Sequence, residues 1–204
     1  MPQIGLEGQQ RIASAVVAVV GDDLGCEVVA RVLAAAGVGR LRLVRRTGPL
    51  PADVAAAIAA SNPDVRVETC AWPVGDAWLA AVLGATIVVR SGFDDDSMLR
   101  GAVRLALPVV VMRGREDRID VVSFRRHGPC AHAPLDVPEK TGAAPEDGPG
   151  TVVAAHIAAA EALALVAGAA TGEGRARHVS IPIPGAAAWP ERSTDIPWSP
   201  ECFA

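Results

Sequence analysis

Apolar runs of strand length alternate with segments of helical periodicity through the first half of this chain. Residues 16–20 (VVAVV) form a continuous apolar run typical of a buried strand, and residues 24–36 then place apolar side chains at helical spacing up to Gly37. Further strand-type runs follow at 41–44, 65–71, 86–90 and 109–112, with helical segments at 51–60, 76–83 and 95–107. This alternation predicts an α/β fold with a doubly wound, Rossmann-like, mostly parallel sheet.

The rhythm changes in the second half of the chain. Residues 118–125 (RIDVVSFR) alternate by twos, which predicts an antiparallel strand, and residues 178–183 predict a last strand. Between them, residues 151–169 form a helical segment with small side chains nearly all round, so we expect a buried helix. The sheet should therefore end in C-terminal antiparallel strands.

Apolar segments are spread evenly over the 204 residues, which predicts a single domain over 1–204. Residues 127–150 are rich in proline and glycine and predict a mobile loop. Residues 184–204 form a tail rich in proline and tryptophan.

The charge and hydropathy of the chain limit the classes of partner that it can bind. A net charge of −4 and a pI near 5.6 argue against nucleic acid, because counterion release needs clustered basic residues. In the sequence, every apolar run is interrupted well before it reaches the roughly 20 residues that a bilayer needs, so no membrane contact is expected. The first residues lack the order of a secretion signal, and the four cysteines have no framework spacing. We expect a cytoplasmic protein with reduced thiols.

The turn after the first strand has the outline of a phosphate-binding turn and the wrong charge for one. Gly21 and Gly25 flank Asp22 and Asp23 where a strand leads into a helix. Two carboxylates close to a phosphate in a poorly solvated cleft cost on the order of several kcal/mol. One of the aspartates can instead cap the following helix, and the pair binding a metal is the alternative.

Several segments, in order, resemble the ThiF/MoeB/HesA family, the bacterial relatives of ubiquitin-activating enzymes. They are QIGLEGQQRI (3–12), AAAGVG (34–39), NPDV (62–65), GPC (128–130) and SPEC (199–202). The resemblance implies paired protomers that bind MgATP, adenylate the C-terminal glycine of a small carrier protein and pass it on. Relatives of this fold also occur in peptide-modifying systems.

The chain departs from that family where the nucleotide would lie. The family's loop reads roughly GAGGLGS, whereas residues 21–26 read GDDLGC, one residue shorter. At the end of the second strand the family has an acid for the ribose, and this chain has Arg45 and Arg46. Two exposed arginines are one interpretation, and a site for a 2′-phosphate, as in NADP, is the other.

The family's lysine and magnesium acid are also replaced. The lysine precedes the helix that ends in Asn-Pro, but Lys140 is the only lysine of this chain. Phe93 stands where an acid should hold magnesium, with Asp94 directly after it. The acidic triplet 94–96 either takes over a cation or caps the next helix.

The family's zinc site uses two C-x-x-C pairs, and each pair is incomplete here. Cys130 and Cys202 remain, with His132 as the nearest further ligand. Two cysteines and one histidine do not complete a tetrahedral set, so zinc is not expected.

The scaffold pattern is therefore intact while the residues for ATP and metal are replaced. The residues of the vestigial nucleotide site are Gly21, Asp22, Asp23, Gly25, Arg45, Arg46, Phe93 and Asp94. The leading hypothesis is a degenerate ThiF/MoeB-like protein that has lost ATP-dependent adenylation, needs no cofactor, forms a homodimer and binds a carrier protein, peptide or partner enzyme in a specialised biosynthetic pathway. The alternatives are an active adenylyltransferase using MgATP and an NADP-dependent oxidoreductase.

Overall fold

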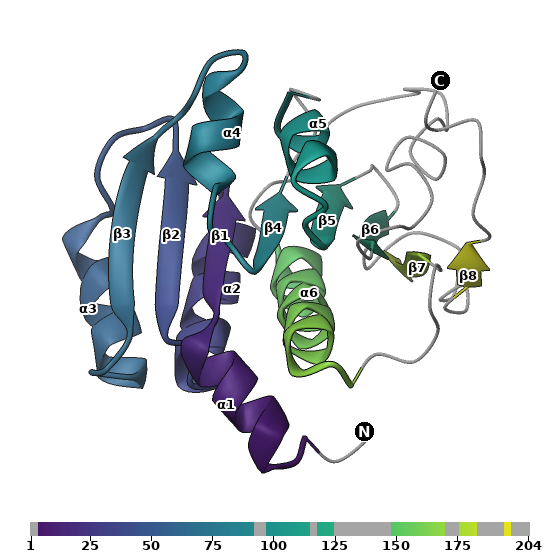
Figure 1. The fold of residues 1–204 in the computed structure, drawn as a ribbon, viewed down its shortest axis with the longest axis horizontal. Coiled ribbons are helices and arrows are strands. Elements are labelled where there is room, and N and C mark those ends of the chain that lie inside the picture. Colours follow the sequence, from purple (N-terminus) through teal and green to yellow (C-terminus); the bar gives the residue numbers. More distant parts are fainter. Residues whose placement is uncertain are drawn as a thin grey trace.

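A single mixed sheet runs through the protein in a computed structural model that describes residues 4–91, 97–114, 118–124, 148–169, 176–182 and 194–196 (Figure 1). Within this part the sheet has eight strands in the order β3-β2-β1-β4-β5-β6-β7-β8. The strands are β1 (Val16–Val20), β2 (Arg40–Arg45), β3 (Arg66–Ala71), β4 (Ile87–Ser91), β5 (Val109–Gly114), β6 (Arg118–Phe124), β7 (Ala176–Pro182) and β8 (Thr194–Ile196).

Strands β1 to β5 are parallel, and β6 to β8 continue the sheet in antiparallel fashion. β1 lies between β2 and β4, so the strand order reverses at the boundary between β1 and β4. Both the parallel half and the antiparallel end confirm the prediction from the sequence. The short strand β8 and the first helix were not anticipated.

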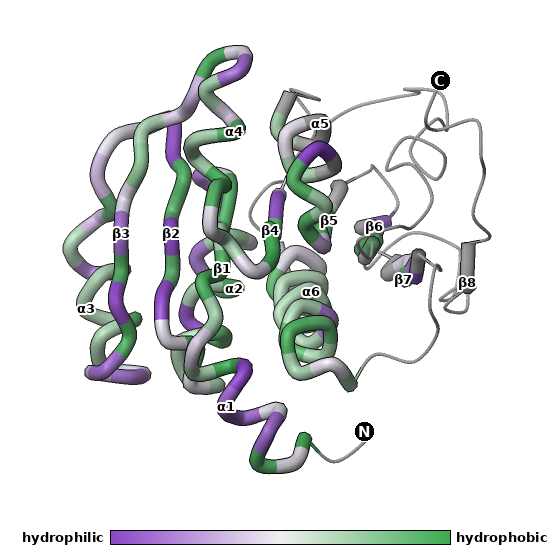
Figure 2. The backbone as a smooth tube through the Cα atoms, in the orientation of Figure 1, coloured by the Kyte–Doolittle hydropathy of each residue, from purple (hydrophilic) through white to green (hydrophobic). Residues whose placement is uncertain are grey.

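Helices cover both faces of the sheet. They are α1 (Leu6–Ser14), α2 (Leu24–Ala35), α3 (Ala52–Ser61), α4 (Ala77–Val82), α5 (Ser97–Arg104) and α6 (Pro149–Ala167). Alternate residues of β1 separate the two halves of the core: Val17 and Val19 pack with α2 and α6, whereas Ala18 and Val20 pack on the side of α4 and α5. Figure 2 shows the apolar colouring concentrated on β1, β4 and α6.

Helix α6 is long and apolar enough to cross a membrane by length and composition, which the runs counted from the sequence did not show. In this fold its buried side packs against α2 and against the sheet. The expected burial of this helix is found on one side only, because Val153 is 48% exposed and His156 is exposed as well. The alanine-rich side faces the core and the remaining side faces outward.

Two buried carboxylates hold the antiparallel half together. Glu161 of α6 accepts a hydrogen bond from Ser123 Oγ at 3.2 Å and pairs with Arg177 of β7. Asp120 of β6 lies 3.0 Å from His178 Nε2. Each carboxylate is thereby matched across neighbouring elements, as buried acids require.

Several expectations lie outside the described residues. The loop predicted at 127–150 is described only from 148 onward, and the tail at 184–204 only at 194–196. The helix expected at 95–107 is described from Ser97 and ends at Arg104.

Candidate functional site

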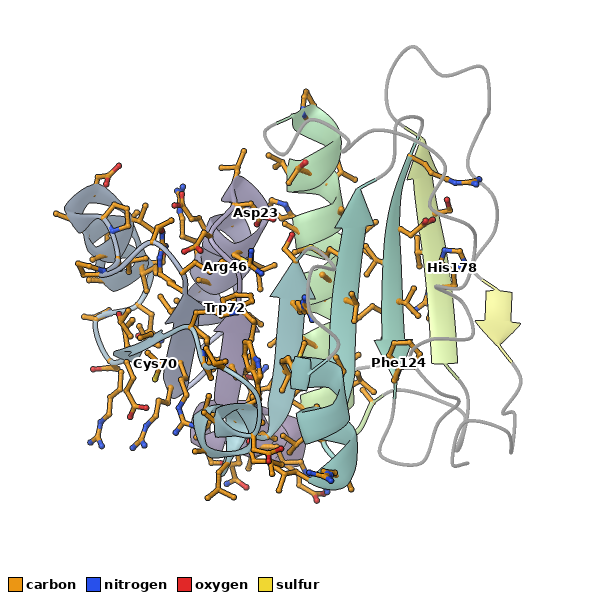
Figure 3. All side chains as sticks on the ribbon, turned by 90° about the horizontal axis from the view of Figure 1, so that it is seen from above. Asp23, Arg46, Cys70, Trp72, Phe124 and His178 are labelled. Carbon is orange, nitrogen blue, oxygen red and sulfur yellow. The ribbon has the colours of Figure 1, made fainter. Side chains whose placement is uncertain are left out.

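The carboxyl ends of β1, β2 and β4 meet where the strand order reverses, the usual place for a ligand in an open α/β sheet. Asp23 lies in the turn after β1, Arg46 directly follows β2 and Trp72 directly follows β3, as Figure 3 shows. β4 contributes Ser91 at its end. These residues form the candidate site.

Asp23 is the N-cap of α2. Its Oδ1 accepts a hydrogen bond from the backbone N–H of Cys26 at 2.8 Å. Its other oxygen accepts a hydrogen bond from Ser91 Oγ at the end of β4. The helix cap expected from the sequence is confirmed, and the N–H group that a phosphate would seek is occupied by the chain itself.

Asp22 points to the other side, toward the end of β2. Its Oδ1 lies 3.1 Å from Arg45 Nε, and its Oδ2 accepts a hydrogen bond from the backbone N–H of Arg46 at 2.8 Å. Thr47 Oγ1 donates a further hydrogen bond to Asp22 at 2.9 Å. One carboxylate thus ties the turn after β1 to the turn after β2.

The interpretation of two exposed arginines is wrong for Arg45. Arg45 is only 6% exposed, because its side chain lies under the turn that Asp22 closes. Arg46 is exposed and lies over the ring of Trp72, with Cζ 4.1 Å from the ring centroid. Trp72 in turn contacts the buried Trp78 edge to face at 5.0 Å between centroids. The neighbouring arginines therefore have different environments.

Packing within the protein accounts for both glycines of the turn. Gly21 has φ +140°, and a Cβ there would lie 2.7 Å from Cys26 Sγ. A Cβ on Gly25 would lie 3.2 Å from Thr151 of α6 and 3.3 Å from Met112 of β5. The glycine pattern that resembles a phosphate loop also serves close contact between α2 and its neighbours.

Cys26 lies under this turn as a neutral thiol. Its Sγ donates a hydrogen bond to the carbonyl oxygen of Val20 at 3.4 Å. Burial raises the pKa of the Cys26 thiol well above its ordinary value, and the nearby carboxylates of Asp23 and Asp22 raise it further. A buried thiol of this kind is a poor nucleophile, because the thiolate is the reactive form.

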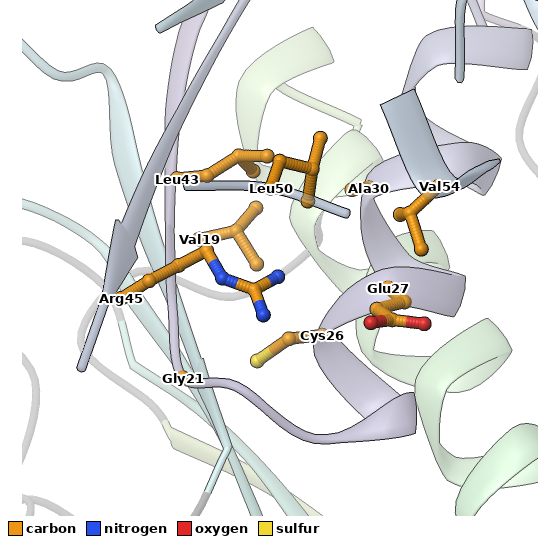
Figure 4. Close-up of a pocket in the computed structure, with 9 residues that line it drawn as sticks. All are labelled: Val19, Gly21, Cys26, Glu27, Ala30, Leu43, Arg45, Leu50 and Val54. Atoms are coloured by element: carbon orange, nitrogen blue, oxygen red, sulfur yellow. The ribbon is translucent and has the colours of Figure 1, made fainter. Parts of the chain in front are cut away.

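A small pocket opens beside the ion pair, between the ends of β1 and β2 and the helices α2 and α3 (Figure 4). Its cavity volume is about 10 Å³, roughly the space that one water molecule needs. Arg45 extends across it toward α2, where Cys26 and Glu27 lie. The other lining residues are Val19, Gly21, Ala30, Leu43, Leu50 and Val54. It is an apolar recess with one guanidinium and one carboxylate.

Four residues of the expected vestigial nucleotide and zinc sites cannot be placed. Phe93, Asp94, Cys130 and Cys202 lie outside the described residues. Where the structure describes the chain, no three histidine, cysteine or acidic side chains gather as metal ligands would. Sequence reasoning missed Ser91, Thr47 and Trp72, whose signal is their position at the carboxyl ends of β4, β2 and β3.

Comparison with known proteins shows the fold and nothing narrower. No family model matches the sequence, and no curated protein matches it. Among solved structures, PaaA is similar at 19% identity with a TM-score of 0.70, covering 94% of this chain and 66% of PaaA. The microcin C7 biosynthetic enzyme MccB in complex with N-formylated MccA is similar at 16% identity with a TM-score of 0.76, covering 97% of this chain and 69% of MccB. MccB of E. coli with ATP is similar at 16% identity with a TM-score of 0.74.

These likenesses show the fold class: the chain has the Rossmann-like fold of PaaA and MccB. The chain spans about two thirds of the length of PaaA and MccB. At identities below 20%, fold similarity does not carry residue roles from those proteins to this one.

Proposed function

We propose that this chain is a degenerate ThiF/MoeB-like protein that does not adenylate a substrate and instead binds a peptide or protein partner. It would act as a scaffolding subunit in a specialised biosynthetic pathway, in the cytoplasm, as a homodimer. Neither ATP with magnesium nor zinc would be part of its working form.

The observation that carries this proposal is the closure of the turn after β1 by the chain's own carboxylates. Asp23 accepts a hydrogen bond from the N–H of Cys26. Asp22 forms an ion pair with Arg45 and accepts a hydrogen bond from the N–H of Arg46. A nucleotide phosphate placed here would displace these bonds and meet two like charges. That repulsion is on the order of several kcal/mol in a poorly solvated site, more than a helix N-terminus returns. The described residues therefore do not fit the phosphates of ATP.

A polypeptide partner is supported by what this fold does elsewhere. MccB has been crystallised with ATP and also with MccA, which is described there as N-formylated. One fold therefore accommodates both a nucleotide and a second polypeptide. This likeness is the basis for proposing a polypeptide partner for a chain that keeps the sheet and the helices and closes the phosphate turn.

The direct experiment is calorimetric titration with MgATP, alongside pyrophosphate exchange in the presence of candidate carrier peptides. We expect no binding tighter than about 100 µM and no exchange, because each lost charged contact costs roughly 2 to 5 kcal/mol. Tighter binding or measurable exchange would favour the alternative of an active adenylyltransferase.

A companion experiment uses the double variant Asp22→Gly, Asp23→Gly with Asp53→Ala as a control. Asp53 is an exposed acid in the first turn of α3, so its loss changes the net charge without touching the site. Restored tight ATP binding in the double variant alone would identify the carboxylates as the single switch. We expect no restoration, because the other departures remain.

The positions of Arg45 and Arg46 do not support the alternative of an NADP-dependent oxidoreductase. Arg45 faces Asp22 at 3.1 Å and is buried, so it is not available to a 2′-phosphate. Arg46 is engaged with the ring of Trp72. We keep the peptide-binding proposal ahead of it.

A further inference from the structure

Strand β3 forms one edge of the sheet, at the side remote from β8 (Figure 1). The backbone N–H of Arg66 donates to the carbonyl oxygen of Gly39 at 3.0 Å, toward β2. Successive residues of a strand direct their backbone groups to opposite edges, so 66, 68 and 70 face β2. The N–H and C=O groups of Val67, Thr69 and Ala71 therefore point outward, away from the sheet.

These outward groups are open to a partner. Nothing in the described part of the chain forms a hydrogen bond with the outward N–H or C=O groups of Val67, Thr69 or Ala71. The three side chains are exposed, with Val67 at 39%. These side chains lie on the sheet face that α2 and α3 pack against. Because they are exposed there, neither helix covers the β3 edge of that face. Backbone donors and acceptors in a row on an exposed edge form a template for a further strand.

The other face of the same edge is basic. Glu68 is shared by two guanidiniums, Arg40 at 3.2 Å and Arg42 at 3.3 Å. Arg66 is exposed and makes no ion pair with any residue that the structure describes. One carboxylate thus faces three arginines on β2 and β3. The only other acid close in sequence is Asp64, in the exposed turn before β3.

We propose that β3 is the docking edge for an extended, acidic segment of the partner polypeptide, which adds to the sheet as a further strand. This inference rests on the proposed function. An acidic side chain on the basic face of the added strand would lie beside Arg66, with Arg40 behind it on β2, and small or aliphatic side chains on the other face would lie beside Val67 and Ala71. Each well-placed opposite-charge pair across strands contributes modestly, and the backbone hydrogen bonds contribute the rest.

A second copy of this chain fits the edge less well. Outward-facing residues must lie opposite outward-facing ones, so the two longest antiparallel β3–β3 registers set Glu68 opposite either Glu68 or Cys70, and neither register forms an ion pair. The register that sets Arg66 opposite Glu68 overlaps only over residues 66–68, because a turn at 63–64 precedes the strand. The charge pattern therefore favours a different, acidic chain.

The test compares Thr69→Pro with Thr69→Ala in the whole protein. Proline removes one outward N–H and leaves the bonds to β2 intact, as edge positions allow, whereas alanine keeps the N–H. The probe is the capped peptide EVETEV, with KVKTKV as the charge-reversed comparison, and binding is followed by NMR of the backbone amides. We expect EVETEV to shift and protect the amides of Val67, Thr69 and Ala71, with at least tenfold weaker binding in Thr69→Pro and little change in Thr69→Ala.

The variant Arg66→Glu gives an independent result if Thr69→Pro fails to fold. It should reverse the preference between EVETEV and KVKTKV. Equal binding of both peptides by wild type and Arg66→Glu, or equal binding of EVETEV by Thr69→Pro and Thr69→Ala, would overturn the inference. A dimer that Thr69→Pro converts to a monomer would overturn it too, because the occupant would then be a second copy.

The same variants separate this inference from the proposed function. The polypeptides encoded beside the gene are titrated against wild type and Thr69→Pro. Unchanged binding by Thr69→Pro would refute the β3 site and leave the peptide-binding function standing. Absence of binding by wild type would refute both.

Discussion

At the scale of single residues, Asp22 and Asp23 are adjacent in sequence and serve opposite sides of the site. Asp23 turns toward α2 and β4, where it meets the N–H of Cys26 and the hydroxyl of Ser91. Asp22 turns toward β2, where it neutralises a guanidinium that is 6% exposed. The same pair of acids that argues against a phosphate therefore stabilises the closed turn.

Removing the Asp22 carboxylate should destabilise the fold. Asp22→Ala leaves Arg45 buried without its counter-charge, and we expect a loss of about 2 to 3 kcal/mol in the free energy of unfolding. Urea denaturation of the single variants and of Asp22→Ala, Arg45→Leu measures the coupling. The double variant should recover part of the loss. Additive losses would mean that the 3.1 Å contact contributes nothing to stability.

The Cys26 thiol should make stability depend on alkaline pH. Its pKa is raised in the folded state, first by burial and then by Asp23, so the folded protein holds the proton more tightly than the unfolded chain. The contribution is complete below the ordinary thiol pKa of 9.0 and is lost progressively as the pH rises above that value. Unfolding free energies measured between pH 8 and pH 10 should fall more steeply in wild type than in Cys26→Ala. Parallel curves would contradict the assignment.

At the scale of elements, the start of α2 depends on one cap. Asp23→Ala should lower the free energy of unfolding by about 1 kcal/mol or slightly more, since the cap and the bond from Ser91 are both lost. Asp23→Ser retains an N-cap oxygen and should keep most of the stability. Thermal or urea denaturation of the two variants under identical conditions measures the difference. Equal losses in both would show that the carboxylate acts through its charge and not as a cap.

The elements were predictable because their periodicity follows burial. The run at 16–20 and the helical spacing after it became β1 and α2. Helix α1 was missed because only Gly8 and Ile12 of its nine residues are buried, which leaves a weak apolar signal. Strand β8 has three residues, too few to show a period.

The site was less predictable because its contacts join residues far apart in the chain. Asp22 bonds to the N–H of Arg46, 24 positions later, and Asp23 to Ser91, 68 positions later. A sequence shows that carboxylates follow the first strand, but not the direction in which each one turns. The burial of Arg45 follows from that direction, which explains why two exposed arginines were expected and one was found.

At the scale of the whole molecule, the outer face of α3 bears on the predicted homodimer. The resembling family pairs its protomers, and the exposed side of α3 carries five alanines and one charged residue, Asp53 in the first turn. The alanines are Ala52, Ala55, Ala56, Ala59 and Ala60. Small side chains allow two helices to approach closely, so α3 is one of two places where we expect the dimer interface. The other is the helical segment predicted at 95–107, whose described part is α5.

Sedimentation of the wild type at micromolar concentration should therefore give twice the chain mass of 20.9 kDa. Ala56→Arg places a bulky charge in the middle of the exposed face of α3 and should yield a monomer, whereas Thr69→Pro on the β3 edge should leave the dimer intact. A clean monomer in the wild type would refute the homodimer outright. A dimer that survives Ala56→Arg would move the interface away from α3. If Thr69→Pro converts the dimer to a monomer, the β3 edge is the dimer interface, and the proposed docking of an acidic partner on β3 is refuted.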